Sequence, residues 1–347
     1  MRRHWRSRPR KAPRSGRPAG YHRLPRHRDG RSARGGRRAG GTVIGVVGEA
    51  LIDLEVAADD ARHPVAHPGG SPMNAAVTLG RLGTETAFLG RLSSDAFGKL
   101  LRTHLAESDV NLRWIVDAEE PTSLAIVSVD PGGSAAYAFH TGGTADWQWS
   151  TDELPRDPGV DAVHTGSLAL ALEPGGPVLE RWLAGLSTRT TISLDPNVRP
   201  ALLGERAAYR DRLERWLAFA SIVKVSDEDL AWVWPGEAPE TLAERWITKG
   251  RKLVVVTRGE GGSLVWAGGE SFAVEAVPVD VVDTVGAGDA FSGGLLDWLD
   301  RHGRLRLGDL DRLTAGEARE AVGFASRVAA VTCSRAGANP PRRSELD

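Results

Sequence analysis

The second half of the chain alternates short apolar strands with helices, and this alternation restricts the fold more than any other feature of the sequence. Four apolar runs, each too short to be a helix by itself, are separated by segments with helical periodicity. The predicted strands cover residues 162–165, 191–194, 222–225 and 253–257, and the predicted helices cover residues 177–186, 207–219 and 241–249. Strands that are apolar on both faces and are joined by helices indicate a parallel sheet with helices on both sides.

The same pattern extends towards both ends of the chain, with two antiparallel interruptions. Further strands are predicted over residues 42–47 and 86–89, and further helices over residues 75–82, 96–107 and 315–333. The interruptions lie near residues 53–68 and 123–140, and in the second a Pro-Gly-Gly turn separates two short strands. We expect them to form a small β-sheet lid. Because no long linker breaks the pattern, residues 41–347 are predicted to form one domain.

A glycine-rich junction between a strand and a helix is the strongest candidate for a functional site. Residues 283–289 read Asp-Thr-Val-Gly-Ala-Gly-Asp and lie between a predicted strand (272–282) and a predicted helix (290–299). The amides of Gly286, Ala287 and Gly288 would lie at the helix N-terminus, where unpaired donors attract an anion. A carboxylate at the same place, Asp289, suits a base that takes a proton from a hydroxyl while amides stabilise a phosphoryl group in transfer.

A simpler interpretation is that Asp289 only caps this helix, since aspartate is a preferred N-cap and the chain holds 41 glycines. The strand, the Asp-Thr pair, the tight Gly-Ala-Gly and the helix that follows all agree with one another. Their agreement favours the catalytic interpretation over a bare helix cap.

The charge distribution separates the first 40 residues from the rest of the chain. They contain 14 Arg and Lys11 against the single acid Asp29, whereas the remaining 307 residues carry 29 basic and 44 acidic side chains. A basic tail suits nucleic acid, a membrane surface or a targeting signal, but this one lacks the apolar core of a signal peptide. We therefore expect residues 1–40 to be a disordered Arg-rich extension, or a start codon assigned too far upstream.

The composition also indicates in which cellular compartment the protein is expected. Cys333 is the only cysteine, so the chain has no internal disulfide and no thiolate zinc site, which favours a reducing compartment. No apolar run reaches transmembrane length. We expect a cytoplasmic protein.

With these motifs in place, the chain resembles the ribokinase-like (PfkB) carbohydrate kinases over nearly all of residues 43–341, and most of all their fructokinase branch. The family's N-terminal motif is matched by residues 69–76 (Gly-Gly-Ser-Pro-Met-Asn-Ala-Ala) and its C-terminal motif by residues 283–291. The likeness to fructokinases rests on residues 48–53, 144–146 and 195–200. The resemblance implies an α/β fold, a three-layer α/β/α sandwich with a mostly parallel central sheet and a small β-sheet lid. It also implies transfer of the γ-phosphate of ATP to a hydroxyl of a small sugar, with fructose as the leading substrate.

The resemblance implies a role for each motif residue. Asp289 would be the base, and the amides of Gly286, Ala287 and Gly288 the anion hole. The residues implied for the sugar are Asp53, Gly69, Gly70, Asn74, Arg199 and Asp289. Those implied for the nucleotide are Lys224, Ser226, Thr257, Gly259, Gly262, Gly286, Gly288 and Ser326. The resemblance further implies Mg²⁺ near Asp229, and Asp283 with the carbonyl of Val285 match a monovalent-cation (K⁺) site.

Some of these positions have structural interpretations or depart from the family pattern. Asp53 would serve equally as a turn residue, Asn74 as a helix cap and Arg199 as a solvated loop charge. Many relatives have Asn and Glu where this chain has Ser226 and Asp229, and many have Asn where it has Ser326. The departures weaken the assignment of these three residues, although the acid at 229 keeps the charge.

Other enzyme classes fit the motifs poorly. A dinucleotide dehydrogenase needs Gly-x-Gly-x-x-Gly after the first strand, but residues 45–48 have the wrong spacing and Glu49 follows. A P-loop enzyme needs Gly-Lys-Ser/Thr, and here Leu100 follows Lys99. A regulator of the same fold that binds sugar or nucleotide without catalysis would be expected to lose the base, which is present.

Within the kinase class the substrate stays open. 2-Dehydro-3-deoxygluconate is the alternative to fructose, because its carboxylate would need a cation such as Arg91 or Arg199, and ribose ranks lower. The expected partners are a small sugar and a second copy of the chain, paired through the exposed edges of the lid. We expect neither nucleic acid nor a membrane as a partner.

Overall fold

The computed structural model describes residues 42–57, 60–129 and 135–346. Within this range the largest sheet has eight strands in the order β14-β13-β12-β11-β10-β9-β1-β4. The strands from β4 to β12 are parallel, and only β13 and β14 run as an antiparallel hairpin at one end. Their bounds are β1 Ile44–Val47, β4 Thr86–Leu89, β9 Ala162–Gly166, β10 Thr191–Asp195, β11 Ile222–Ser226, β12 Leu253–Thr257, β13 Ser263–Ala267 and β14 Glu270–Val274.

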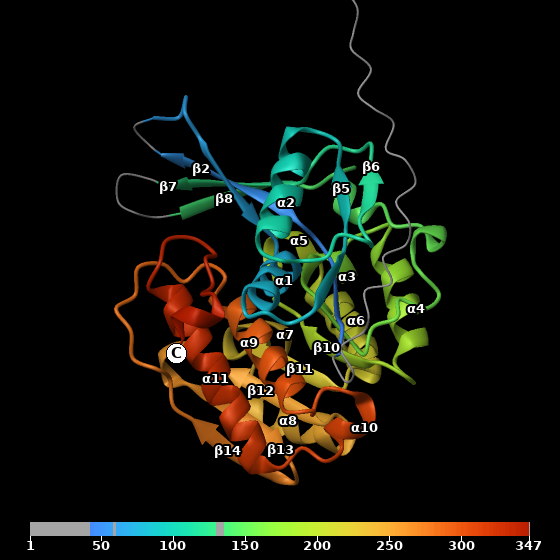
Figure 1. Ribbon diagram of the computed structural model, residues 1–347, viewed down its shortest axis with the longest axis vertical. Helices are drawn as coiled ribbons and strands as arrows, with labels where there is room; N and C mark the ends of the chain where they lie inside the picture. Colours follow the sequence, from blue (N-terminus) through green and yellow to red (C-terminus); the bar gives the residue numbers. More distant parts are fainter. Residues whose placement is uncertain (1–41, 58–59, 130–134, 347) are drawn as a thin grey trace, which may run out of the picture. The chain divides into compact units, whose positions relative to one another are not determined.

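Helices cover both faces of this sheet because its strands are apolar on both sides. Alternate residues of β11 and β12 enter two separate apolar cores, for example Ile222 and Leu253 in one and Val223 and Val254 in the other. The first core contains residues of α1 Ser71–Arg81, α2 Ala96–Glu107, α9 Ala287–Arg301, α10 Leu307–Leu310 and α11 Ala315–Cys333. The second contains residues of α3 Ser167–Ala171, α4 Gly176–Leu186, α5 Pro200–Leu203, α6 Arg206–Phe219, α7 Asp227–Val233 and α8 Pro239–Thr248. The predicted three-layer α/β/α sandwich is confirmed (Figure 1).

A second, smaller sheet stands apart from β12, β13 and β14 of the first (Figure 1). Its strand order is β3-β2-β7-β8, with β2 Leu51–Ala57, β3 Val65–Gly69, β7 Leu124–Val129 and β8 Ala135–His140. The hairpins β2–β3 and β7–β8 are antiparallel, whereas β2 and β7 pair in parallel. Two further short strands, β5 Arg91–Ser93 and β6 Val116–Ala118, pair with each other. We refer to β3-β2-β7-β8 as the small sheet.

The predicted strand over residues 272–282 is wrong after its first three residues. Strand β14 ends at Val274, and residues 275–286 form no regular element. Pro278 removes a backbone donor, and β14 already lies at the end of the sheet order. Val281 and Val282 are consequently more than 60 % exposed although they are apolar.

Strand β13 was not predicted, because its sequence lies next to a glycine-rich loop. It pairs with β14 through the two-residue turn Gly268-Gly269, in which both residues have positive φ (59° and 82°). A two-residue hairpin turn with positive φ at both central positions is of type I′, and glycine adopts these angles without strain. Among the helices in the described ranges, none has both the length and the apolar character needed to cross a bilayer.

Candidate active site

Helix α9 begins at the predicted anion hole. Gly286 is its N-cap, with φ 75°, and a side chain there would come within 2.6 Å of the Ala338 Cβ. A side chain at Gly288 would lie 2.9 Å from the Lys224 ammonium. Gly286 is therefore favoured by its positive φ and by its close approach to Ala338, whereas a side chain at Gly288 would have to displace the end of the Lys224 side chain. The Ala287 amide already donates to the Thr284 carbonyl at 3.2 Å, so a bound anion would share that donor.

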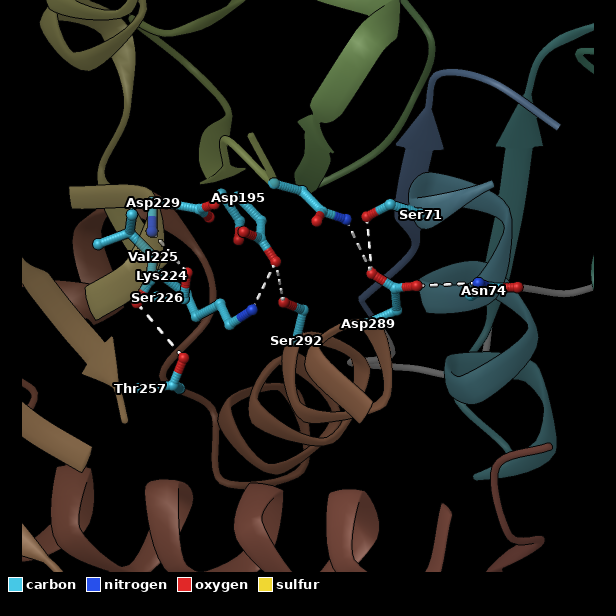
Figure 2. A network of polar contacts seen from close by, with 12 residues as sticks. Ser71, Asn74, Asp195, Lys224, Val225, Ser226, Asp229, Thr257, Asp289 and Ser292 are labelled. Atoms are coloured by element: carbon cyan, nitrogen blue, oxygen red, sulfur yellow. Dashed lines mark hydrogen bonds and ion pairs between the residues drawn. The ribbon is translucent and has the colours of Figure 1, made fainter. Parts of the chain in front are cut away.

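Asp289, in the first turn of α9, is buried, and side chains from two other elements donate hydrogen bonds to it. Ser71 Oγ donates to its Oδ1 at 2.7 Å and Asn74 Nδ2 to its Oδ2 at 2.8 Å, both from α1. Asn197, in the loop after β10, lies farther away, with 3.4 Å between its Nδ2 and Oδ1. Figure 2 shows this cluster at the start of α9. Burial raises the pKa of Asp289, while the Asn74 and Ser71 bonds and the Lys224 charge oppose that rise.

A second polar cluster lies one turn further along α9. The Lys224 Nζ donates to Asp195 Oδ2 at 2.8 Å, and Ser292 Oγ donates to the same oxygen at 3.1 Å (Figure 2). The other carboxylate oxygen, Oδ1, is buried without a hydrogen-bond partner in the described part of the chain. Burial disfavours the Lys224 charge, but the neighbouring Asp195 outweighs this effect and the pKa of Lys224 is raised. A buried cation is thus held beside the Gly288 backbone.

Asp53 lies on β2, directly against the end of β3. Its Oδ2 is 2.1 Å from the position that a Cβ on Gly69 would occupy, so a side chain at position 69 would have to displace the Asp53 carboxylate. Burial raises the pKa of Asp53 to about 6, His67 and Arg199 lower it, and Asp289 raises it. Asp53 is thus within electrostatic reach of both Arg199 and the candidate base Asp289. Gly70, with φ 107°, joins β3 to α1 in front of Asn74.

The two arginines considered for an acidic sugar differ in their surroundings. Arg91 is buried and makes ion pairs with Glu120 and Glu153, while its Nε donates to the Ala145 carbonyl at 2.9 Å. Its charge is already neutralised, so it is a poor receptor for a substrate carboxylate. Arg199 is exposed and donates to backbone carbonyls of its own loop, at 3.1 Å to Val198.

The candidate nucleotide residues are brought together less completely. Ser226 and Thr257 end the paired strands β11 and β12, but Ser226 Oγ caps α7 by accepting the Asp229 amide at 3.0 Å. Gly259 and Gly262 form the turn that follows, with φ 51° and 74°. Ser326 lies half-buried on α11, without a recorded hydrogen bond to the other candidates in the described residues.

The candidate cation ligands lie in two places. Asp229 Oδ1 accepts the Val198 amide at 3.2 Å, and burial followed by the nearby Asp195 raises its pKa to about 6. Asp283 accepts the amides of Val285 at 3.0 Å and of Gly337 at 2.8 Å. Within the described ranges no group of three or more His, Cys, Asp or Glu side chains could hold a metal ion. Any cation would therefore need ligands from a substrate, from backbone or from water.

Sequence reasoning missed four residues of this site: Ser71, Asp195, Asn197 and Ser292. Three of them lie in motifs that the sequence analysis singled out, residues 69–76 and 195–200. Ser292 follows Asp289 by three residues and so shares its helix face, which is the signal that would have indicated it.

Comparison with known proteins agrees with this geometry. The model of the pfkB family of carbohydrate kinases matches residues 42–345. A fructokinase of Rhizobium leguminosarum bv. trifolii is 38% identical over 255 residues, which cover 72% of this chain and 77% of the relative. A probable fructokinase of Arabidopsis thaliana is 33% identical over 313 residues, 86% of this chain and 94% of the relative.

Solved structures give the same result. The fructokinase of Xylella fastidiosa with bound ATP has a TM-score of 0.79 and 28% identity, over 88% of this chain and 96% of the other. The aminoimidazole riboside kinase of Salmonella enterica has a TM-score of 0.73 and 26% identity, over 88% and 98% of the two chains. The chain therefore belongs to the pfkB family of carbohydrate kinases, on its fructokinase branch, and is an ATP-dependent carbohydrate kinase.

Proposed function

We propose that this kinase transfers the γ-phosphoryl group of ATP to a hydroxyl of fructose, with Asp289 as the general base. The observation that carries the proposal is the buried Asp289 carboxylate in the first turn of α9, next to a glycine-lined helix N-terminus and the Lys224 ammonium. The relatives named fructokinases support fructose as the acceptor.

Each group then has one task in the transfer. Asp289 takes the proton of the attacking sugar hydroxyl, and the hydroxyl oxygen bonds to the γ-phosphorus as the bond to ADP breaks. Ser71 and Asn74 fix the carboxylate in position and moderate its raised pKa. The amides of Gly286, Ala287 and Gly288, together with Lys224, stabilise charge on the transferring group.

The remaining candidates bind the two substrates. Asp53, Asn74 and Arg199, with the backbone of Gly69 and Gly70, hold the sugar beneath the small sheet, which acts as its lid. The residues proposed for the nucleotide are Lys224, Ser226, Thr257, Gly259, Gly262 and Ser326. Buried carboxylate and amide groups suit sugar diols, because the carboxylate accepts hydrogen bonds and the amide both donates and accepts them.

The side chains of the site also fit metal ions. Asp195 has a buried oxygen without a partner and Asp229 lies within electrostatic reach of it, so these two acids would hold Mg²⁺ directly or through water. When bound, the ion neutralises phosphate charge. Asp283 and the Val285 carbonyl would hold K⁺ in the loop before α9, since both offer oxygen atoms.

Two other substrates are less well supported. An acidic sugar such as 2-dehydro-3-deoxygluconate would depend on Arg199 alone, because Arg91 is bound to Glu120 and Glu153. Ribose has one carbon fewer than fructose, and no group of the site has been assigned to take the place of that carbon. A regulator without catalysis on the same fold would not need a base, and Asp289 is present.

The test is ATP-dependent ADP release by the purified chain with fructose, ribose, 2-dehydro-3-deoxygluconate, adenosine and fructose phosphates as separate acceptors. A rate with fructose at least tenfold above the other acceptors supports the proposal. A higher rate with another acceptor reassigns the substrate, and ATP binding without any turnover would favour a regulator.

The raised pKa of Asp53 predicts a pH effect on sugar binding. Asp53 accepts sugar hydroxyls as a carboxylate, so KM for the sugar should rise about tenfold per pH unit as pH falls below about 6. Above pH 7 Asp53 is fully ionised and makes no further contribution to the pH dependence of KM. The measurement is KM between pH 5 and 8, with Asp53→Asn as the control, in which the slope should vanish. An equal slope in that variant would assign the titration to another group.

We also propose that two copies of the chain pair through the small sheet. Strand β3 is an end of this sheet, and Val65 on it is 53% exposed, so it offers backbone donors and an apolar side chain to a partner. Light scattering should give the mass of a dimer, and Val65→Lys should shift it towards the monomer. A monomeric mass of the unmodified chain would rule out this dimer.

A further inference from the structure

One buried carboxyl group, Asp146, lies where the small sheet joins the rest of the fold. It follows β8 in the short 3₁₀ helix Ala145–Trp147 and is 1 % exposed. Its Oδ1 accepts the amide of Ala50 at 2.8 Å, just before β2, and its Oδ2 contacts Ser123 Oγ, just before β7. Three of the chain segments that enter or leave the small sheet therefore meet at this one side chain.

The hydrogen bonds around Asp146 can be counted proton by proton. Ser123 Oγ lies 2.6 Å from Thr144 Oγ1, and Thr144 Oγ1 in turn donates to the Thr141 carbonyl at 2.9 Å. This chain of three contacts contains only two hydroxyl protons. If Asp146 is a carboxylate, Ser123 Oγ donates to its Oδ2 and one of the three contacts has no proton. If the carboxyl group carries a proton, Ser123 donates to Thr144 and each of the three contacts has one.

A second buried acid, Glu49, lies near Asp146 and interacts with it electrostatically. Its Oε2 accepts the Ala169 amide at 3.0 Å, and further bonds come from the Leu168 amide and the Ser167 side chain. Several N–H donors stabilise a carboxylate, whereas a chain of hydroxyls can accept a proton. Burial raises the pKa of Glu49 as well, but its hydrogen bonds with Ser167, Ala169 and Leu168 oppose that rise. Of the two acids, Asp146 is the one that contacts a chain of two hydroxyls.

We propose that Asp146 is held as a neutral carboxylic acid, whose proton completes the hydrogen-bond chain that fixes the small sheet to the core. The structure thus assigns it as a positioning residue: it acts on the sugar site through β2, which carries Asp53. Burial raises the pKa of Asp146 to about 7; the hydrogen bonds with Ser123 and Ala50 oppose this rise, and the nearby Glu49 adds to it.

The other charged groups around Asp146 are already paired. Arg91 on β5 donates to the Ala145 carbonyl, but its charge is neutralised by Glu120 and Glu153. Asp95, at the start of α2, binds the amide and the hydroxyl of Thr122, the residue before Ser123. Hydrogen bonds with these groups and with Gly98 lower the pKa of Asp95, although burial opposes them, so this acid is the ionised counterpart of Asp146.

The assignment predicts how stability changes with pH. The folded state binds one proton at Asp146 up to about pH 7, whereas the unfolded chain releases it near the ordinary value of 3.8. Between these two values the folded state holds more protons, so its stability falls as pH rises. The equilibrium constant for unfolding should increase by about tenfold per pH unit in this window from Asp146 alone.

The decisive variant is Asp146→Asn in the full chain. An asparagine keeps an acceptor for the Ala50 amide and supplies a permanent donor to Ser123, so it imitates the neutral acid. Urea titrations between pH 5 and 8 should show a variant as stable as the wild type at pH 5. Between pH 5 and about pH 7 it should become increasingly more stable than the wild type, by about tenfold per pH unit in the unfolding constant, and the difference should level off towards pH 8. Asp95→Asn is the matched control, and it should be destabilised at every pH because it replaces an ionised acceptor.

Two outcomes would overturn the proposal. One is that Asp146→Asn is less stable than the wild type at pH 8 or fails to fold, which would mean that the carboxylate is required. The other is a stability difference between the two proteins that does not change with pH. Infrared spectra give an independent readout: the C=O stretching band of a protonated carboxyl at pH 5 should lose intensity in Asp146→Asn and not in Asp95→Asn.

The effect on the sugar site rests on the proposed function. Asp146→Ala, which removes the link to both Ala50 and Ser123, should raise KM for the sugar about tenfold and change kcat less, and Asp146→Asn should keep both near wild type. An equal fall of kcat in both variants would contradict the positioning role. The urea and infrared results do not depend on turnover, so an incorrect substrate would leave them intact.

Discussion

Replacing Asp289 by asparagine should lower kcat by about 10²–10⁴-fold, while nucleotide binding stays near the wild-type value. The amide has nearly the same shape as the carboxylate but cannot accept the hydroxyl proton. Because both Ser71 and Asn74 donate to Asp289, one of these bonds is lost in the variant. That loss should cost about 1–2 kcal/mol of stability, too little to explain the fall in rate.

The measurement is steady-state turnover with saturating sugar and ATP, together with calorimetric titration of an ATP analogue. Asp152→Asn serves as the control, because this acid is exposed and lies outside the site. Turnover of Asp289→Asn within tenfold of the wild type would exclude Asp289 as the base. Loss of nucleotide binding as well would instead indicate that the carboxylate supports the structure of the α9 N-terminus.

The core strands and helices were predictable because local sequence patterns define where they begin and end. The strands β4 and β12 and the helices α2 and α11 have the predicted bounds, since apolar periodicity and flanking turn residues define them. The errors arose where tertiary context decides. Residues 275–282 alternate like a strand but find no neighbouring strand, and Gly268-Gly269 makes a hairpin where the sequence suggested only a loop.

The site shows the same division. Asp289, Asn74 and Lys224 belong to motifs with a chemical reason, and the structure places them around the start of α9. The contact between Asp195 and Ser292 could not be predicted, because the two residues are 97 positions apart in the sequence. The charge state of Asp146 was equally hidden, since it follows from which hydroxyls surround it.

Replacing Lys224 by methionine should have the largest effect on stability. Lys224 and Asp195 form an ion pair in which the two side chains are 8 % and 2 % exposed, and one oxygen of Asp195 already lacks a partner. Removing the ammonium leaves a buried carboxylate whose remaining donor, among the residues that the structure describes, is Ser292. Breaking such a pair typically costs about 3–5 kcal/mol, so the free energy of unfolding should fall by that amount. Turnover should fall as well, because the cation beside Gly288 is lost.

A double-mutant cycle separates these two effects. In Lys224→Met with Asp195→Asn no buried charge is left uncompensated, so most of the lost stability should return, as a coupling of about 1–3 kcal/mol or more. Turnover should not return, because neither substitution restores a cation at the helix N-terminus. Urea titrations of the four proteins give the coupling energy, and turnover of the double variant gives the catalytic term. If Lys224→Met alone costs less than about 1 kcal/mol, Asp195 is not held as a buried anion. If the double variant recovers turnover as well as stability, Lys224 acts only on the fold and takes no part in phosphoryl transfer.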